Sequence, residues 1–501
     1  MIRRAGQRRR VWIAILATAI LVGACAVRPI LFLTGVAISD RDERKPLAAG
    51  MTDDASRLNA TRIEEIWNMP VGDDAPEKLR DLLAWARNRH LCVSIAGARH
   101  SMGGQTIFPN GIQINMLPYH AMTLDEKNNL LDVQAGAKWA DVLPFLERHQ
   151  LSVAVMQSNN SFSVGGSLSV NCHGWQPGKP PIASTVDSLR LMTADGTILR
   201  CSRSENAQLF SAVLGGYGLF GIILDAELRV VPNERYQIHQ YVMATKDFMP
   251  AWKAQVIASS DVGMALGRLS VVRDDFLNHA ILYTFNRTHA VRGPLPPLSD
   301  MGFQEIARIL FRGSVNSDYG KHLRWEAETQ LVSHLSAKFF SRNQLLNQPV
   351  EFLENRTADS TDILQEYFVP RENFEDFVAS MRKIIPAGGG NLLNVTLRDV
   401  RTDNDTLLRY ADRDMIALVL LFNQKMTAAD EARMRLLTQQ LIDAALALGG
   451  RYYLPYRLEA TPRQFYQAYP QANRFFSLKQ QYDPSGIFQN EFYLQYDTAL
   501  H

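Results

Sequence analysis

The pattern of apolar and polar positions changes along the chain and thereby divides it into parts. From residue 61 to about residue 232, short runs with strand-like character, such as "LCVSIAG" and "GIQINM", are separated by brief helical stretches such as "WADVLPFLERHQ". From residue 236 to residue 450 the elements are longer. This pattern predicts an α+β protein with one domain at 61–235 and a second at 236–450, followed by the remaining residues 451–501.

Two helices are predicted, and the second of them also carries signals for both of its ends. The stretch "APEKLRDLLAWARNRH" carries Leu79 and Leu83 at helical spacing. The stretch "TAADEARMRLLTQQLIDAALALGG" is amphipathic, with Thr427 and Asp430 in a capping-box arrangement at its start and Gly449 after its last turn. A buried strand, "DMIALVLLF", is predicted just before the second helix.

The amino terminus has a strongly biased composition. Five of its first ten residues are arginines, and an uncharged run follows from Val11 to Val27. This pattern predicts a signal sequence or membrane anchor over 1–38, joined by a charged linker at 39–60. Because arginines stay on the inner side of a membrane, we expect the rest of the chain on the outer, periplasm-like side. "QRRRVW" also fits a twin-arginine export signal, and "LVGAC" fits a lipoprotein cleavage box that ends at Cys25.

An insertion follows the Pro-rich stretch "RGPLPPLSD" in the second domain. Its segments "FQEIARILFRG" and "RWEAETQLVSHLSAKFFSR" are basic and amphipathic. They are interpreted either as solvated helices or as a lid that touches a membrane or a lipid-like substrate.

Charge and cysteine content exclude several classes of protein. The 53 basic and 51 acidic residues nearly cancel, to a net charge of +2, so we expect no nucleic-acid partner. The four cysteines form no CxxC pair, and the histidines form no HExxH motif. We therefore expect neither a disulfide scaffold nor a metal site.

Three loops rich in small residues lie in the first domain, at 97–104, 163–174 and 215–221. The last contains "GYGLFG", which fits the GxGxxG pattern of dinucleotide-binding Rossmann folds. In a Rossmann unit a strand precedes the glycines and a helix follows them. Here "NAQLFSAVL" before the glycines is helix-like and "IILDAELRVV" after them is strand-like, so the Rossmann interpretation is rejected.

The three loops together resemble the FAD-binding domain of the vanillyl-alcohol oxidase superfamily, also called the PCMH-type fold. The motifs that carry the resemblance are "IAGARHSMGG", "VGGSLSVNCHG", "STVDSLRLMTADG", "ENAQLFSAVLGGYGLFGII" and, near the end, "QYDPSGIFQNEF". The resemblance implies an α+β fold with a two-subdomain PCMH-type FAD-binding domain, an α+β substrate or cap domain, and a carboxy-terminal segment that returns to the FAD domain.

The resemblance also implies FAD as the cofactor. Carried over residue by residue, it assigns cofactor contacts to Gly97, Ala98, Arg99, His100, Ser101, Gly165, Gly166, Ser167, Asn171, His173, Gly174, Gly216, Gly218, Gly221, Ile222 and Ile223.

His100 matches the histidine that many members join covalently to the flavin. We therefore expect FAD tethered through His100, with a histidine that only orders the loop as the alternative. Arg99 stands where members usually have glycine, and it either neutralises the pyrophosphate or bends the loop. A second tether is not expected, because "QSNNSFSVGG" contains no cysteine.

The carboxy-terminal stretch "GGRYYLPYRLEATPRQFYQAYP" resembles the sugar-lactone, alditol and decaprenylphosphoryl-ribose oxidase branches. In the last of these a lysine stands where this chain has Tyr456. The candidate catalytic residues are Arg398, Gln365, Tyr453 and Tyr456, with Tyr367 beside them.

The resemblance implies oxidation of a CH–OH group of a sugar, polyol, lactone or related alcohol by hydride transfer to flavin N5. Oxygen, a quinone or a cytochrome would accept the electrons, and the amino terminus would contact the membrane. "ARHSMGGQ" also resembles the glycine-histidine loop of cytokinin dehydrogenases, so amine oxidation is one alternative. A non-catalytic FAD-fold module that binds at the membrane is the other.

Overall fold

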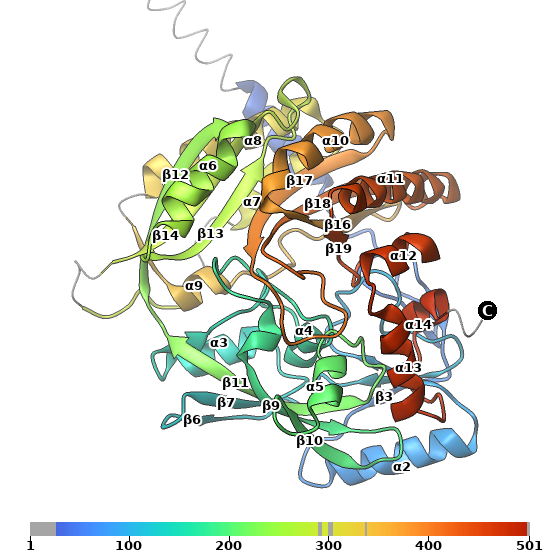
Figure 1. The fold of residues 1–501 in the computed structure, drawn as a ribbon. Coiled ribbons are helices and arrows are strands. Elements are labelled where there is room, and N and C mark those ends of the chain that lie inside the picture. The colour runs from blue at the N-terminus through green and yellow to red at the C-terminus, as the bar shows by residue number, and fades with distance from the viewer. Residues whose placement is uncertain (1–26, 289–292, 299–303, 336–337, 498–501) are drawn as a thin grey trace, which may run out of the picture.

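The computed structural model describes residues 27–288, 293–298, 304–335 and 338–497, which form two lobes packed against each other (Figure 1). The first lobe contains the strands as far as β11, and the second contains those from β12 onward. Buried apolar side chains of both lobes join in one continuous core. Helices and sheets of mixed connectivity confirm the predicted α+β class.

The first lobe holds three small sheets. Strands β3 (Glu65–Asn68), β5 (Ile112–Asn115) and β4 (Val93–Ala96) form a parallel sheet in that order, and β1 (Met51–Thr52) pairs with β2 (Thr61–Arg62). The third sheet is antiparallel, in the order β10 (Ile198–Ser202), β9 (Val186–Met192), β11 (Ile222–Pro232), β7 (Leu130–Gln134) and β6 (Met122–Asp125). Strand β8 (Leu151–Val153) pairs with the end of β11.

Four helices accompany these sheets: α2 (Ala75–Asn88), α3 (Trp139–Glu147), α4 (Val164–Ser169) and α5 (Ala207–Val213). Helix α2 follows the predicted spacing, because Leu79 and Leu83 are fully buried on one side of it. Helix α5 precedes the third glycine loop and β11 follows that loop, in the order that the sequence predicted.

The second lobe is built on an eight-stranded antiparallel sheet (Figure 1). Its order is β15 (Phe339–Ser341), β12 (Arg235–Ala244), β14 (His279–Arg287), β13 (Val262–Leu269), β17 (Asn391–Val400), β18 (Met415–Lys425), β16 (Ser360–Pro370) and β19 (Arg451–Tyr452).

One face of this sheet packs on α6 (Phe248–Trp252), α10 (Phe374–Ala387) and α11 (Ala428–Ala447). The ring of Tyr367 lies 5.4 Å from that of Phe377 in α10. A Cβ atom at Gly267 would lie 2.5 Å from the ring of Phe248 in α6, so this glycine permits the close approach. We call this the helix-covered face.

The opposite face points toward the first lobe, and we call it the inner face. Part of it is covered by α7 (Gln304–Gly313) and α8 (Asp318–Leu335) of the insertion. The side chains of Gln240 and Tyr283, which are paired in register, donate hydrogen bonds of 2.7 and 3.1 Å to the carbonyl oxygen of Glu328 in α8. The insertion therefore packs on the sheet in these described parts.

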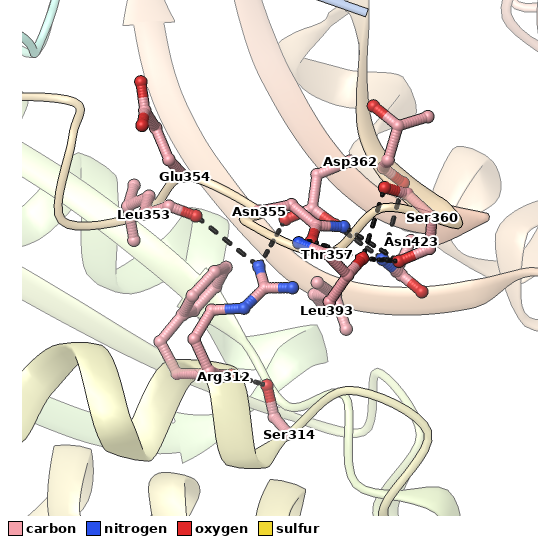
Figure 2. A network of polar contacts seen from close by, with 12 residues as sticks. Arg312, Ser314, Leu353, Glu354, Asn355, Thr357, Ser360, Asp362, Leu393 and Asn423 are labelled. Atoms are coloured by element: carbon pink, nitrogen blue, oxygen red, sulfur yellow. Dashed lines mark hydrogen bonds and ion pairs between the residues drawn. The ribbon is translucent and has the colours of Figure 1, made fainter. Parts of the chain in front are cut away.

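An ion pair fixes α7 to the edge of the same face. Arg312 of α7 lies 2.6 Å from Asp362 of β16, and both side chains are nearly buried. The other oxygen of Asp362 accepts hydrogen bonds from the amides of Asn355 and Asn423 at 3.2 and 2.7 Å. Figure 2 shows this network between the helix, the loop before β16 and the strands.

The carboxy-terminal helices α12 (Pro462–Ala468), α13 (Ala472–Tyr482) and α14 (Glu491–Tyr496) run from the second lobe back along the first (Figure 1). The backbone amide of Val93 in β4 donates to the carbonyl of Ile487 at 2.7 Å. The ring of Phe475 lies 5.0 Å from that of Phe220, beside the third glycine loop. Helix α9 (Arg342–Leu346) lies at the junction of the lobes.

The predicted amino-terminal anchor falls largely outside the described residues, which begin at residue 27. Residues 27–39 are helical and pack on the insertion, where the ring of Phe32 lies 5.2 Å from that of Tyr319. In the described part of the chain, no helix has both the length and the apolar character needed to cross a membrane.

Candidate active site

The first glycine loop begins where β4 ends, at Ala96. Gly97 has no room for a side chain, because a Cβ atom there would lie 1.9 Å from Oγ of Ser163 in the second glycine loop. The backbone amide of Ala98 donates to that same oxygen at 3.3 Å. The first and second loops therefore lie side by side, although 65 positions separate these two residues.

Arg99 adopts a backbone conformation that suits glycine. Its φ is +57°, in the left-handed region. The side chain is half-buried, and burial lowers the pKa of its guanidinium. Among the ion pairs of the described residues, none involves Arg99. The arginine thus holds a backbone conformation that glycine adopts without strain, and it adds a cation to the loop.

His100 lies against the second loop. Its ring is 4.2 Å from that of Phe162, at an angle of 32°. Burial lowers the pKa of His100, although the nearby Glu351 opposes the effect. The imidazole is therefore neutral at neutral pH, which is the form with a nucleophilic ring nitrogen.

The second glycine loop runs through the short helix α4 and on to Gly174. A Cβ atom at Gly165 would lie 2.7 Å from Ala135, and one at Gly174 would lie 2.0 Å from the carbonyl oxygen of Met156. Gly166 is less crowded by backbone, with only Oγ of Ser163 at 2.9 Å. The glycines here allow tight packing of backbone on backbone.

Two of the polar residues predicted to bind cofactor have protein partners in this structure. Ser167 donates to Gln157 at 2.8 Å and accepts from the indole of Trp139 at 2.9 Å. Asn171 donates to Asp403 at 2.9 Å, and its amide oxygen accepts from the backbone of Ala183 at 3.1 Å. Both side chains therefore stabilise the conformation of the second glycine loop through contacts with the protein.

The third glycine loop lines a small pocket. Gly216, Gly218, Gly221 and Ile223 form its wall together with Ser169 of the second loop, while Ile222 is fully buried at the start of β11. The backbone amide of Tyr217 donates to the carbonyl of Ser169 at 3.0 Å. Two glycine loops therefore meet at this pocket.

The first glycine loop fits a cofactor that carries phosphate. Among the described residues, the backbone amides of Arg99, His100 and Ser101 have no hydrogen-bond acceptor, and neither has the buried hydroxyl of Ser101. Free amides in a turn that contains a left-handed residue form a cradle for anionic oxygens. With the cation of Arg99 beside them, residues 98–101 suit a pyrophosphate.

A carboxylate that the sequence reasoning missed lies where the two lobes meet. Glu366 stands on β16 with its side chain on the inner face and is 3% exposed. Its Oε1 lies 2.6 Å from Nε2 of His173 in the second glycine loop. Its Oε2 accepts a hydrogen bond of 3.3 Å from the hydroxyl of Tyr456.

Aromatic rings surround this group and shield it from bulk solvent. The ring of His173 lies 5.4, 5.8 and 5.9 Å from those of Phe368, Tyr410 and Tyr453. Nδ1 of His173 is buried, and among the described residues it has no hydrogen-bond partner. Such a group of a carboxylate, an imidazole and a phenol in an apolar wall suits proton transfer.

The hydroxyl of Tyr456 stays protonated and therefore donates its hydrogen bond to Glu366. Burial raises the pKa of Tyr456 well above its ordinary value, and the charge of Glu366 raises it further. Arg398 acts in the opposite direction and lowers this pKa, so its guanidinium lies near the group. The phenol remains a hydrogen-bond donor throughout the neutral range.

The other predicted catalytic residues divide between the two faces of the sheet. Arg398 lies on the inner face and donates to Oγ of Ser158 at 2.8 Å. Gln365 lies on the helix-covered face, where it donates to Thr438 of α11 at 2.7 Å and accepts from Tyr367 at 2.7 Å. The side chains of Gln365 and Tyr367 therefore point away from that of Glu366, although these residues line one small cavity together with Tyr453 and Tyr456.

Tyr453 belongs to the wall of this group. Its hydroxyl donates to the carbonyl oxygen of Val170 at 2.9 Å and thereby joins the second lobe to the second glycine loop. Burial raises its pKa well above the ordinary value. Tyr453 is therefore a packed aromatic residue whose hydroxyl has a hydrogen-bond partner.

The strand alternation contained a signal for Glu366. In "LQEYFVP" the side chains of Gln365 and Tyr367 share one face, so Glu366 and Phe368 share the other. An acidic residue inside an otherwise apolar strand is costly to bury unless it has a partner. Such a residue is therefore a candidate for a functional site. That argument would have added Glu366 to the candidates. In the described part of the chain, no three His, Cys, Asp or Glu residues are arranged to hold a metal ion.

Two models of protein families match the sequence. One, described as "FAD binding domain", matches residues 74–202, and the other, described as "D-arabinono-1,4-lactone oxidase", matches residues 314–496. The first range contains His100 and His173, and the second contains Glu366, Arg398 and Tyr456. Both halves of the site therefore lie within the matched ranges.

Curated proteins are also similar to this chain over much of its length. L-gulonolactone oxidase of Bos taurus is 23% identical over 437 residues, which are 83% of this chain and 92% of the relative. Cytokinin dehydrogenase 7 of Oryza sativa subsp. japonica is 24% identical over 503 residues, or 91% of each protein. An uncharacterized oxidoreductase of Rhodococcoides fascians is 31% identical over 300 residues, or 57% of this chain and 66% of the relative.

Proposed function

This chain belongs to the superfamily of PCMH-type FAD-binding oxidoreductases, and from that premise we propose that it oxidises a CH–OH group of a sugar, polyol, lactone or related alcohol. The match to the D-arabinono-1,4-lactone oxidase family over residues 314–496 supports this substrate class. The similarity to L-gulonolactone oxidases of Bos taurus and Mus musculus supports it as well.

The observation that carries the proposal is the buried carboxylate of Glu366 between His173 and Tyr456. Oxidation of an alcohol to a carbonyl removes a hydride from carbon and a proton from oxygen. FAD, when bound, supplies the acceptor for the hydride. Glu366 supplies a base for the proton within an apolar wall, where no bulk water competes for it.

Each neighbour of Glu366 has a separate task in this proposal. Nε2 of His173 holds Oε1 of the carboxylate in place, and the phenol of Tyr456 donates to Oε2. The proton from the substrate hydroxyl goes to the carboxylate. Arg398, anchored on Ser158, lies on the same face and binds a polar part of the substrate.

FAD is held in the first lobe, and we extend the proposal to a covalent bond between His100 and the flavin. The neutral imidazole of His100 and the glycine-like backbone of Arg99 support it. A histidine that only orders the loop remains the alternative, and acid precipitation of the flavoprotein distinguishes the two.

The location of the protein and its electron acceptor also belong to the proposal. The arginines and the apolar run before residue 28 support an anchored protein whose lobes lie outside the cytoplasm. There the electrons would pass to oxygen, a membrane quinone or a cytochrome.

Amine oxidation is the second candidate, because cytokinin dehydrogenase 7 is similar to 91% of this chain. Anaerobic mixing of the oxidised enzyme with a panel of sugar lactones, polyols and adenine-derived secondary amines tests both candidates. Bleaching of the flavin by a lactone or polyol, with no bleaching by amines, is the expected result. Bleaching by amines alone would contradict alcohol oxidation and support amine oxidation.

A further inference from the structure

A row of arginines extends across the inner face of the eight-stranded sheet from Glu366. In the register of the strands, Arg268 of β13 pairs with Thr396 of β17, Thr396 pairs with Val419 of β18, and Val419 pairs with Glu366 of β16. Paired residues point to the same face. Arg268 therefore shares a face with Glu366, three strand spacings or about 14 Å away.

Two more arginines complete the row. Arg398 is two residues beyond Thr396 on β17 and so lies on the same face, between Arg268 and the group around Glu366. Arg324 reaches this face from α8, where it donates to the carbonyl of Leu393 at 2.7 Å and to Asn394 at 2.8 Å. The insertion thus contributes a cation to the same face of the sheet that carries Glu366.

Negative charge on this surface does not balance the positive charge. Arg324 has a carboxylate partner, Glu328, at 2.7 Å. Among the ion pairs of the described residues, neither Arg268 nor Arg398 has a carboxylate within 4.0 Å. Within the part of the chain that the structure describes, the guanidinium of Arg268 donates to two neutral side chains, those of Asn394 and Thr396, at 2.5 and 2.8 Å.

Both guanidinium groups are half-buried and lack a carboxylate partner among the described residues. Burial lowers the pKa of Arg268, and the charges of Arg324 and Arg398 lower it further, against the effect of Glu328. Nε of Arg398 is buried and, among the described residues, has no hydrogen-bond partner. Cations that are partly removed from water and have no counter-ion stabilise a bound anion.

We propose that the substrate carries an anionic group, a carboxylate or a phosphate, which Arg268 and Arg398 bind while the oxidised hydroxyl lies at Glu366. This inference rests on the proposed function and narrows its substrate class to acidic sugars and polyols. Guanidinium groups match the paired oxygens of either anion. The separation of the two arginines from Glu366 selects a substrate whose acid group and reacting carbon are several bonds apart.

Binding to the holoenzyme tests the inference without catalysis. Isothermal titration calorimetry with D-gluconate and D-glucitol compares a carboxylate with the matching alcohol, and inorganic phosphate probes the other anion. We expect D-gluconate or phosphate to bind at least ten times more tightly than D-glucitol. Preference for gluconate alone identifies a carboxylate site, and preference for phosphate alone identifies a phosphate site. Equal or weaker binding of both anions overturns the inference.

Variants separate the role of the arginines from their packing. Arg268→Gln and Arg398→Gln should each weaken binding of the preferred anion at least tenfold, and Arg268→Gln should leave D-glucitol binding unchanged. Two such variants keep the test decisive if one of them does not fold. Arg273→Gln is the control, because Arg273 is 80% exposed and pairs with Asp318 on the surface. Anion binding that survives both substitutions, in variants with wild-type flavin content, contradicts the inference.

Failure of the inference can be told from failure of the proposed function. Neutral polyols or lactones that bleach the flavin, in an enzyme that binds neither anion, leave the proposed function standing and remove the inference. Anions that bind through Arg268, in an enzyme whose flavin no alcohol reduces, support the anion site and remove the proposed reaction.

Discussion

Glu366 and Gln365 are neighbours in sequence, yet the strand sends their side chains to opposite faces of the sheet. The carboxylate meets His173 and Tyr456, whereas the amide meets Thr438 of α11. Substitutions at these two positions should therefore have opposite consequences for activity and stability.

Glu366→Gln removes the proposed base and keeps the size of the side chain. We expect the rate of anaerobic flavin reduction by substrate to fall at least 100-fold, as is usual when a general base is lost. Flavin content should remain that of the wild type. The control Gln365→Met should reduce flavin at the wild-type rate and unfold at a lower urea concentration. An unimpaired rate in Glu366→Gln would remove this residue from the chemistry.

Arg99 holds a conformation that costs an L-residue about 1 kcal/mol. Arg99→Gly and Arg99→Ala both remove the guanidinium, but only glycine is relaxed at a φ of +57°. We expect the glycine variant to be the more stable of the two by about 1 kcal/mol, measured as the difference in free energy of unfolding in urea. An alanine variant of equal or greater stability would show that the loop has another shape.

His100 should bond to the flavin only when its imidazole is neutral. Burial lowers the pKa of His100 from its ordinary value of 6.5, so the neutral form persists to a pH below that value. The yellow colour of wild-type protein should stay in the acid pellet, and that of His100→Ala should pass to the supernatant.

The pH dependence of this bond has a definite sign. Reconstitution of flavin-free protein should form the bond at a constant rate in neutral and alkaline buffer, and the rate should fall as acid protonates the ring. Complete loss of flavin from the acid pellet of the wild-type protein would refute the tether. His100 would then only order the loop.

Local patterns in the sequence predicted the elements that depend on neighbouring residues. The amphipathic spacing located α2 and α11, and Thr427 accepts the expected hydrogen bond from the backbone amide of Asp430 at 3.2 Å. The strand-like runs located β4 and β18. Which helix covers which face of the sheet was not predictable, because Arg312 and Asp362 lie 50 positions apart and only the fold brings them together.

The Arg312–Asp362 pair fixes α7 on the inner face. Asp362→Ala leaves the buried guanidinium without its counter-ion, and we expect a loss of about 3 kcal/mol in stability. Hydrogen exchange should increase in α7. The double variant Arg312→Met, Asp362→Leu removes both charges and should recover more than half of the loss. Unchanged exchange in α7 after Asp362→Ala would show that other contacts hold the helix.

At the scale of the whole molecule, the site exists only where the two lobes meet. The motifs of the glycine loops could be recognised, because close approach of backbone demands glycine at fixed spacing. The contact between His173 and Glu366 could not be predicted, because 193 positions separate the two residues. Neither residue lies in a sequence motif that includes the other. The row of Arg268 and Arg398 has the same origin, because only strand register places it beside Glu366.

Asn490 joins the carboxy-terminal segment to two of the glycine loops. Its amide donates to the carbonyl oxygens of Gln105 and Tyr217 at 2.9 and 2.8 Å, and its side-chain oxygen caps α14 by accepting from Tyr493 at 3.0 Å. All three bonds are buried. The residue therefore couples the end of the chain to the part of the first lobe that we propose holds FAD.

Asn490→Ala removes the three bonds at once and leaves two buried carbonyl groups unsatisfied. We expect a loss of about 3 kcal/mol in stability and weaker binding of FAD, because the first and third loops lose their common support. Asn473→Ala is the matched control, since Asn473 is exposed on the neighbouring helix α13. Urea unfolding and the flavin retained after dialysis measure the two effects. Stability lost with flavin fully retained would show that the loops hold their shape without the carboxy-terminal segment.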